Sequence, residues 1–173
     1  EIRLSLVGSE MCIRDSIDRC LKQLGVREIP LLIITHGHAD HIAGWPGVKK
    51  GRRIAQTWYQ NVKRGTKAQL QSAKGPVDIE VLWPDSGSYD PNNSSIAVRI
   101  TTKDYTLFAG GDMEPLTQSQ IAATTREVDI YKVCHHGSAY QDQLFTRALS
   151  PQVAMISVGA GNSYGHPAPI TLE

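Results

Sequence analysis

The order of hydrophobic and polar residues predicts a chain that alternates between strands and helices. Residues 29–35 (IPLLIIT) form a continuous apolar run, which is typical of a strand buried on both faces. Residues 77–83 alternate and stop at Pro84, and residues 95–101 and 105–109 have the pattern of a hairpin. The other expected elements are strands at 128–134 and 153–158 and helices at 17–24, 114–123 and 141–149. Because hairpin and helical connections are mixed, we expect a layered α/β fold.

The N-terminal segment differs from the rest of the chain. Residues 5–16 (SLVGSEMCIRDS) resemble a string that recurs in translated short-read assemblies, where adaptor sequence is read as protein. We therefore expect residues 1–16 to be a non-native segment and residues 17–173 to form the domain. Ser16 is then the predicted N-cap of the first helix, which Gly25 would end.

Composition narrows the class of protein. The chain has 173 residues, of which 40% are hydrophobic and 20% are charged, so it is neither disordered nor collagen-like. Its length fits one domain. No apolar run reaches the ~18 residues that a membrane helix needs. The three cysteines lack the spacing of a disulfide framework.

A basic tract is hidden within the formal net charge of +1. Residues 41–77 hold eight Lys and Arg residues and no Asp or Glu. Such a tract can attract a polyanion such as DNA, or it can be an ordinary solvated surface. The candidate substrate contacts within it are Lys49, Lys50, Arg52 and Arg53.

The six histidines lie in three short clusters, each just past a predicted strand. Residues 35–44 read THGHADHIAG, an H-x-H-x-D-H pattern. Two histidines at i and i+2 can leave a strand in the same direction, and a tight loop then brings an Asp and a third His to face them. This supplies nitrogen and carboxylate ligands for one or two cations such as Zn, Mn or Fe. The candidate ligands here are His36, His38, Asp40 and His41.

This motif resembles the signature of the metallo-β-lactamase superfamily. Gly110-Gly111-Asp112 resembles the metal-bridging aspartate of that superfamily. The segments VDIEVLWP, NNSSIAVRI, YKVCHHGS and ISVGAGNSYGHP resemble the ComEC-type competence and DNA-uptake proteins. The resemblance covers residues 17–173. It implies an αββα sandwich, here incomplete at both ends, and a hydrolase with one or two divalent ions, Zn or Mn.

The resemblance also implies a role for each site residue. The metal ligands are His36 and His38 for one ion, Asp40, His41 and His166 for the other, and Asp112 between them. Asp40 would also orient the attacking hydroxide. His135 or His136 would serve as a general acid or as a replacement ligand. ComEC-like sequences commonly have Asp where His38 stands.

Asn92 and Asn93 stand where many relatives outside this branch have a further histidine, so they become candidate substrate contacts. The first metal site is then short of a nitrogen ligand unless His135 fills the place. Ser138 could bind a phosphate or cap the next helix. Cys134 could be a soft ligand or a buried strand cysteine.

Three functions remain open from the sequence. The first is a metal-dependent phosphodiesterase or nuclease that acts on DNA as its partner. The second is a small-molecule hydrolase of the same fold that cleaves a thioester, lactone or β-lactam. The third is a non-catalytic DNA-binding or scaffold module. A ComEC-like parent would be a multispanning protein of the bacterial inner membrane with this domain outside the cytoplasm; a stand-alone soluble relative is the alternative.

Overall fold

The computed structural model describes residues 10–85, 89–159 and 162–173. The helices are α1 (Glu10–Gln23), α2 (Ala39–Ile42), α3 (Trp45–Lys49), α4 (Pro115–Ala122) and α5 (Gln143–Leu149), with short 3-10 turns η1 (Cys134–Gly137) and η2 (Pro169–Thr171). The strands are β1 (Glu28–Ile33), β2 (Arg53–Trp58), β3 (Lys67–Ser72), β4 (Gly75–Trp83), β5 (Ala97–Thr101), β6 (Thr106–Ala109), β7 (Ile130–Lys132) and β8 (Val153–Met155).

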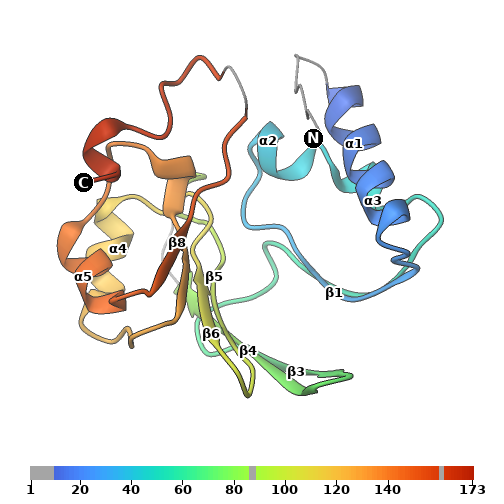
Figure 1. Cartoon of the computed structure of the whole chain (residues 1–173), viewed down its shortest axis with the longest axis horizontal. Coiled ribbons are helices and arrows are strands. Elements are labelled where there is room, and N and C mark those ends of the chain that lie inside the picture. The colour runs from blue at the N-terminus through green and yellow to red at the C-terminus, as the bar shows by residue number, and fades with distance from the viewer. Residues whose placement is uncertain (1–9, 86–88, 160–161) are drawn as a thin grey trace.

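The strands form two sheets packed face to face. β1 and β2 pair in parallel, and the larger sheet has the order β3-β4-β5-β6-β7-β8. In the larger sheet β3 to β6 are antiparallel, whereas β6, β7 and β8 are parallel. Figure 1 shows α4 and α5 on one side of the larger sheet and β1, α1 and α3 on the other. The expected layered α/β sandwich is confirmed.

Two hydrophobic cores hold these layers together. Between the sheets lie Trp58, Ile79, Val81, Ile96 and Val98. Between the larger sheet and α4 and α5 lie Trp83, Phe108, Tyr131, Phe145 and Leu149, among others. The register of β4 against β5 shifts between Val81 and Trp83. This irregularity turns Trp83 into the helix-covered core although Val81 faces the other sheet.

The first helix begins earlier than the sequence pattern predicts. α1 starts at Glu10, so Ser16 lies inside the helix and is not its N-cap. Residues 10–16 contain neither Gly nor Pro, so nothing in them interrupts a helix. The expected boundary at residue 16 therefore falls within α1. Residues 1–9 of the predicted non-native segment lie outside the described residues, and the assignment of residues 1–16 as non-native stays a prediction.

Two strand expectations need correction. β1 is only partly buried, and Pro30 and Glu28 are exposed. Within the described residues β1 pairs with β2 alone, so its other edge lacks the cover that a fully buried strand would have. β8 ends at Met155 and all three of its residues are exposed, because it is the last strand of the larger sheet.

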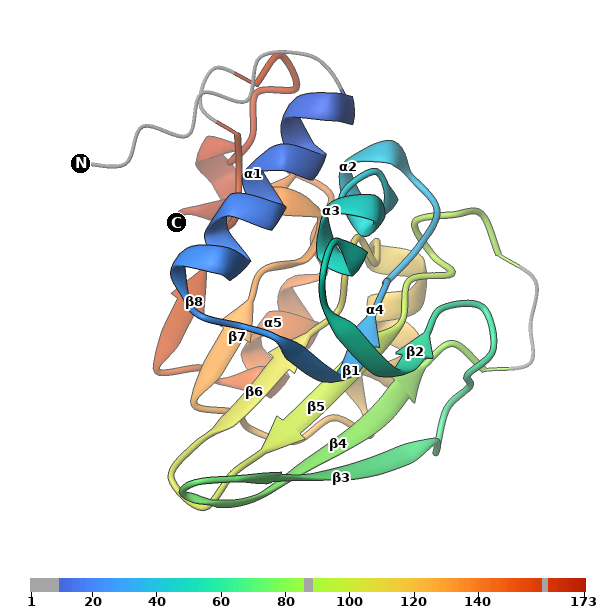
Figure 2. The ribbon, with the colours of Figure 1, turned by 90° about the vertical axis from the view of Figure 1, so that its right-hand side faces the viewer.

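The basic tract contains two strands that the sequence pattern did not reveal. β2 and β3 lie within residues 41–77, where Arg, Lys and Gln interrupt the apolar positions. Figure 2 shows β1 and β2 in front of the larger sheet, with α1 and α3 above them. Among the helices in the described ranges, none has the length and apolar character needed to span a bilayer.

Arg52 is a structural residue, which corrects its expected role as a substrate contact. Its side chain is only 2% exposed, and its Nη1 lies 3.0 Å from Asp18 Oδ1. Arg52 also donates to the carbonyl oxygens of Val26 at 3.0 Å and Gly47 at 3.0 Å. At Gly47 a Cβ atom would collide with the Arg14 carbonyl of α1, so α3 packs closely on α1. Arg52 and Asp18 thus join α1, β1 and α3.

The pairing of Asp18 with Arg52 predicts a measurable loss of stability. The hydrogen bond from Lys22, aided by that from Arg52 and outweighing burial, lowers the pKa of Asp18 from 3.8 to about 2. Since the folded pKa lies below the unfolded one, this stabilisation is present above pH 3.8 and is lost as the pH falls toward 2. Arg52→Gln should lower the Tm by at least roughly 6 °C at pH 7, because it removes the hydrogen bonds of a buried guanidinium to Asp18 and to the carbonyl oxygens of Val26 and Gly47.

Arg53→Gln is the matched control. Arg53 and its partner Glu28 are both largely exposed, and their ion pair of 3.0 Å lies in water. Its loss should move the Tm by less than about 2 °C. Equal shifts for the two variants in a thermal melt followed by circular dichroism would contradict the structural role of Arg52.

Candidate metal centre

The backbone around the H-x-H-x-D-H loop is tied to both sheets. Ile34 N donates to Trp58 O at 2.9 Å, and Ile96 N donates to Thr35 O at 2.9 Å. Gly111 has a φ of +58°, and a Cβ atom there would lie 2.8 Å from both Ser95 Oγ and Thr35 Cβ. Only glycine meets both conditions without strain. The loop after β1 and the Gly110-Gly111-Asp112 turn after β6 are therefore held against each other.

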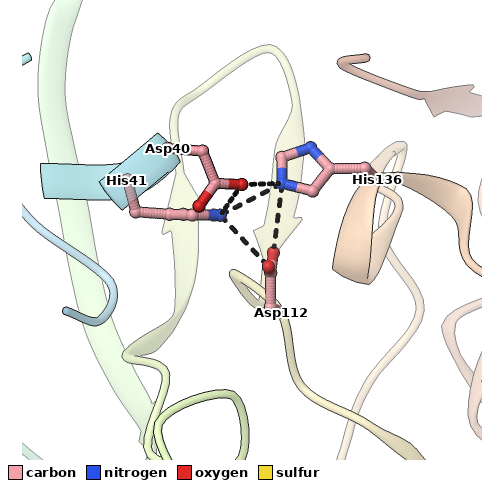
Figure 3. Close-up of side chains that lie close together, drawn as sticks. All are labelled: Asp40, His41, Asp112 and His136. Carbon is pink, nitrogen blue, oxygen red and sulfur yellow. Dashed lines mark hydrogen bonds and ion pairs between the residues drawn. The ribbon is translucent and has the colours of Figure 1, made fainter. Parts of the chain in front are cut away.

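Four side chains from three loops converge on one point (Figure 3). His41 Nε2 lies 3.1 Å from Asp112 Oδ2 and 3.1 Å from His136 Nε2. His136 Nε2 lies 3.3 Å from Asp40 Oδ2 and 3.6 Å from Asp112 Oδ1. One ligand atom from each of the four lies within 4.8 Å of all the others. We call Asp40, His41, Asp112 and His136 the His/Asp cluster.

Hydrogen bonds behind the histidines aim their Nε2 atoms into the cluster. His136 Nδ1–H donates to the Ser157 carbonyl oxygen at 2.7 Å, which leaves the Nε2 lone pair of a neutral ring facing Asp40 and Asp112. The Thr35 hydroxyl lies 3.0 Å from His41 Nδ1. When that hydroxyl accepts the Nδ1 proton, His41 also presents a lone pair at Nε2. Partners of this kind fix the tautomer of metal-binding histidines.

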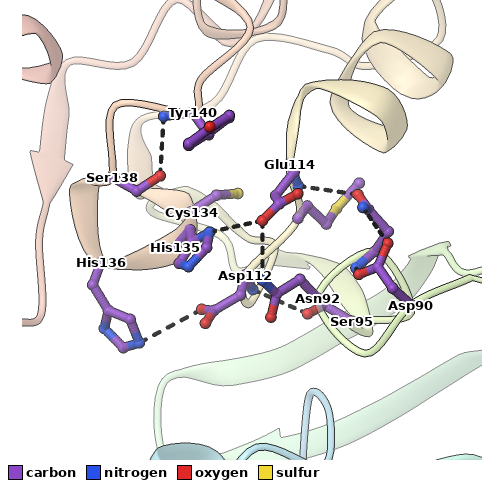
Figure 4. A network of polar contacts seen from close by, with 12 residues as sticks. Asp90, Asn92, Ser95, Asp112, Glu114, Cys134, His135, His136, Ser138 and Tyr140 are labelled. Carbon is purple, nitrogen blue, oxygen red and sulfur yellow. Dashed lines mark hydrogen bonds and ion pairs between the residues drawn. The ribbon is translucent and has the colours of Figure 1, made fainter. Parts of the chain in front are cut away.

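The turn that carries His136 has an unusual backbone. His135 and His136 have φ values of 47° and 52°, and Gly137 follows with a φ of 76°. Left-handed backbone costs a non-glycine residue about 1–2 kcal/mol, so two in succession store strain at this place. The turn is held because His135 N donates to Gly111 O at 3.0 Å. The outcome is that His135 and His136 point in different directions (Figure 4).

Buried atoms without hydrogen-bond partners support a cation at the cluster. Among the described residues, His36 Nε2 and Asp112 Oδ1 are buried and lack such a partner. His36 Nε2 lies 3.8 Å from Asp112 Oδ2, and Ser95 Oγ lies 3.3 Å from His36 Nδ1. Orphaned buried donors and acceptors are costly unless an ion or water meets them. A set of imidazole nitrogens and carboxylate oxygens fits a divalent transition-metal ion.

Charge and burial keep His36 neutral and the two carboxylates ionised, which are the forms that bind cations. Burial, followed by the charge of His41, lowers the pKa of His36 to about 4, so its ring is neutral at pH 7. Burial by itself would raise the pKa of Asp112, but the hydrogen bond from His41 and the nearby histidines hold it below its usual value. His136 likewise lowers the pKa of Asp40 by a hydrogen bond, and Asp40 raises that of His136.

A hollow beside the cluster gathers four of the other predicted site residues. It has a volume of about 430 Å³ and is lined by His38, Asn92, His135 and His166 together with the cluster carboxylates. His135 and His166 have ring centroids 5.6 Å apart. His135 Nδ1 lies 3.4 Å from Glu114 Oε1, which also accepts a hydrogen bond from Asn92 Nδ2 at 3.0 Å.

Asn93, Ser138 and Cys134 do not line this hollow. Asn93 is 3% exposed and its side chain bonds to Asp90 and Thr117, so it braces the loop before β5. Ser138 is 1% exposed and its hydroxyl accepts from Tyr140 N, so it is neither a phosphate ligand nor a helix cap. Asp142 caps α5 in its place. Cys134 is fully buried, and burial raises the pKa of its thiol to about 11.

The remaining basic candidates lie on α3 and β2. Lys49, Lys50 and Arg53 are exposed. Lys49 Nζ lies 4.3 Å from the centroid of the Trp45 ring. Lys50 pairs with Asp18 at 3.5 Å and Arg53 with Glu28 at 3.0 Å. Acids from α1 and β1 therefore cancel part of a charge that looks uncompensated along the sequence.

Sequence reasoning missed the groups that lie beside the ring nitrogens of the predicted site histidines. They are Thr35, Ser95, Glu114 and the carbonyl of Ser157. Thr35 and Ser95 were within the quoted motifs, directly before His36 and β5. No spacing rule points to Glu114 or Ser157, because both act across loops that meet only in the fold.

Comparison with models of known protein families identifies the superfamily to which the chain belongs. A family model described as the Metallo-beta-lactamase superfamily matches residues 10–159. The chain therefore belongs to the metallo-β-lactamase superfamily, as its motifs and the His/Asp cluster indicate.

Within this superfamily, the chain is similar to two curated competence proteins. The chain is 27% identical to ComE operon protein 3 of Bacillus subtilis (strain 168), across 83% of this chain and 22% of that protein. It is also 27% identical to Competence protein ComA of Neisseria gonorrhoeae, across 92% of this chain and 24% of that protein. The resemblance to ComEC-type competence proteins is confirmed. The chain spans about a quarter of the length of these relatives.

Proposed function

We propose that this domain is a metal-dependent phosphodiesterase that acts on DNA within a competence-type protein. The observation that carries the proposal is the convergence of His41, His136 and two carboxylates. The hydrogen bond from His136 Nδ1 to Ser157 O turns the Nε2 atom of His136 toward the other members. The similarity to competence proteins supports DNA as the substrate. It also supports a membrane-associated parent that presents this domain outside the cytoplasm.

The residues of the cluster would hold one divalent ion, Zn or Mn. Its ligands are His41, His136, Asp40 and Asp112. His36 lies beside Asp112 with its Nε2 unpartnered, and His38 lies next to His36, so these two rings are the ligands for a second ion. When bound, such ions polarise a phosphoryl oxygen and make water acidic enough to attack near neutral pH.

Two side chains are placed to move protons during hydrolysis. Asp40 has a side chain that is 59% exposed, so it can orient an attacking water and accept a proton from it. His135 lines the hollow without belonging to the cluster, and its Nδ1 lies 3.4 Å from Glu114 Oε1. We assign His135 the donation of a proton to the leaving oxygen. His166 lies beside it, and burial lowers the pKa of His166, so that its own ring is neutral at pH 7.

A second hollow gives the substrate strand a path away from the metals. It has a volume of about 740 Å³, begins at His36 and His38, and continues past Tyr59, Asn61 and Lys63. Tyr59 offers an aromatic face for a base, and Lys63 offers a charge for a phosphate. The exposed Lys49, Lys50 and Arg53 remain further candidate phosphate contacts.

Substrate preference tests this function. The protein, stripped with EDTA and reloaded with Mn²⁺ or Zn²⁺, should cleave a single-stranded oligonucleotide and bis-p-nitrophenyl phosphate. It should not turn over nitrocefin, a thioester or a lactone at a comparable rate. Cleavage of one of these small molecules with both phosphodiesters intact would instead support the small-molecule hydrolase. No turnover of any of them by the metal-loaded protein would support a binding module.

A further inference from the structure

A third hollow, away from the His/Asp cluster, gathers basic side chains from distant parts of the chain. It has a volume of about 480 Å³ and lies among β3, β4, β5 and the segment after α4. Its charged lining residues are Arg64, Lys67, Arg99, Arg126 and Glu80. We call it the basic hollow. Four cations face one carboxylate there, so the local charge is strongly positive although the chain as a whole is nearly neutral.

Two of the guanidinium groups are held in place by neutral acceptors. Arg99 donates from Nη1 to Arg126 O at 3.1 Å and from Nη2 to Glu127 O at 2.9 Å. Arg64 Nη2 donates to Thr124 Oγ1 at 3.0 Å. Carbonyl and hydroxyl oxygens orient a cation without cancelling its charge, so these groups are pre-organised for an anion.

The carboxylates near the basic hollow compensate only part of its charge. Glu80 pairs with Lys67 at 3.2 Å, and both side chains are exposed. The charge of Arg99 also lowers the pKa of Asp129. However, the pKa of Asp129 is lowered mainly by the backbone and hydroxyl of Thr106, and Arg99 contributes least of the named causes.

The basic hollow is spatially separate from the metal centre. α4 begins at Pro115, three residues after Asp112, and its eight residues rise roughly 12 Å before the chain reaches Arg126. None of the residues that line the basic hollow belongs to the His/Asp cluster or lines the hollow beside it. One phosphate group cannot contact both places, whereas a polymer with a phosphate on every unit can.

We propose that the basic hollow binds the sugar–phosphate backbone of a nucleic-acid strand, several nucleotides from the position of cleavage. Arginine presents a planar set of donors that matches the oxygens of a phosphate. Thr101, Thr124 and Thr125 add hydroxyl groups to the wall, and hydroxyls are frequent partners of phosphate oxygens. The identity of the strand rests on the proposed function, but the anion site itself does not.

Binding without metal separates this inference from the proposed hydrolysis. The probe is a fluorescent single-stranded oligonucleotide of about 12 nucleotides, followed by anisotropy in EDTA at several salt concentrations. The test variant combines Lys67→Gln with Arg126→Gln. The matched control combines Lys74→Gln with Lys103→Gln, which removes the same charge at exposed positions outside the basic hollow.

The test variant should bind at least about tenfold more weakly at low salt than wild type. It should also lose roughly 1.4 units from the slope of log K against log salt, because two phosphate contacts are removed. The control should stay within about twofold of wild type. Metal-supported hydrolysis of bis-p-nitrophenyl phosphate should be unchanged in both variants, since this small ester does not reach the basic hollow.

Equal salt slopes and affinities in the two double variants would overturn the inference. Inorganic phosphate is added as a competitor to distinguish the source of the anion. If inorganic phosphate binds to wild type, and this binding is lost in the test variant while oligonucleotide binding is unaffected, the basic hollow is a small-anion site and the backbone assignment is wrong. If hydrolysis fails but the salt slopes differ as expected, the proposed function falls and this binding site stands.

Discussion

Asp112→Asn should reduce metal-supported hydrolysis of bis-p-nitrophenyl phosphate by at least ~10²-fold in kcat/KM, a barrier increase of roughly 3 kcal/mol. Asp112 is buried and lies within 3.8 Å of His36, His41 and His136 at once. The substitution keeps the size of the side chain but removes the charge on which three histidines converge. Steady-state kinetics with excess Mn²⁺ measure the effect.

Asp104→Asn serves as the control for the loss of a carboxylate. Asp104 lies in the exposed turn between β5 and β6 and does not line any of the hollows described above. It should hydrolyse the ester at the wild-type rate. If Asp112→Asn retains full activity, Asp112 does not bind a catalytic ion and the cluster is structural. A melt of each variant by circular dichroism distinguishes loss of chemistry from loss of fold.

The two adjacent histidines after β7 should behave differently. His136→Ala removes a member of the His/Asp cluster, so it should lower both Mn²⁺ affinity and kcat/KM by at least ~10²-fold. His135→Ala leaves the cluster intact. It should keep the Mn²⁺ affinity of wild type and lower kcat by about 10-fold or more through loss of proton donation.

The measurement that separates these roles is Mn²⁺ affinity alongside kcat for each single variant. His135→Gln, which keeps volume without a titratable ring, is the matched replacement for the acid. A loss of metal by His135→Ala with full metal binding by His136→Ala would reverse the two assignments. The sequence alone leaves open which of His135 and His136 is the metal ligand and which is the acid.

The metal loop could be predicted from sequence because its chemistry is local. Asp40 and His41 sit one beside the other in a short motif, and a strand of apolar residues leads directly into it. Asp112 could be proposed because Gly110-Gly111-Asp112 resembles the bridging aspartate of the metallo-β-lactamase superfamily. The spacing of apolar residues along the chain likewise predicted β4, the β5–β6 hairpin, α4 and α5 near their observed bounds.

The choice between neighbouring residues could not be predicted, because it depends on backbone direction. His135 and His136 differ by one position, and the left-handed turn decides which ring meets Asp112. Asn92 and Asn93 present the same problem, since one lines the hollow and the other is buried against Thr117.

The charge of the basic tract was misjudged for a related reason. The acids that pair with Arg52 and Arg53 are Asp18 and Glu28, which lie outside the tract and approach only after α1 and β1 pack. Conversely, the sequence pattern did not predict the concentration of positive charge at the basic hollow, because Arg99 and Arg126 lie outside the basic tract and reach the hollow only in the folded chain. Long-range pairing, rather than local pattern, sets the electrostatic surface.

Direct titration of the metal-free protein with Mn²⁺, followed by the electron paramagnetic resonance signal of the free ion, tests the central claim that the His/Asp cluster holds a divalent cation. Wild type should remove at least one ion per chain from solution, and the combined Asp112→Asn and His136→Ala variant, still folded, should lose that binding. No uptake by wild type, or equal uptake by the folded double variant, would contradict it.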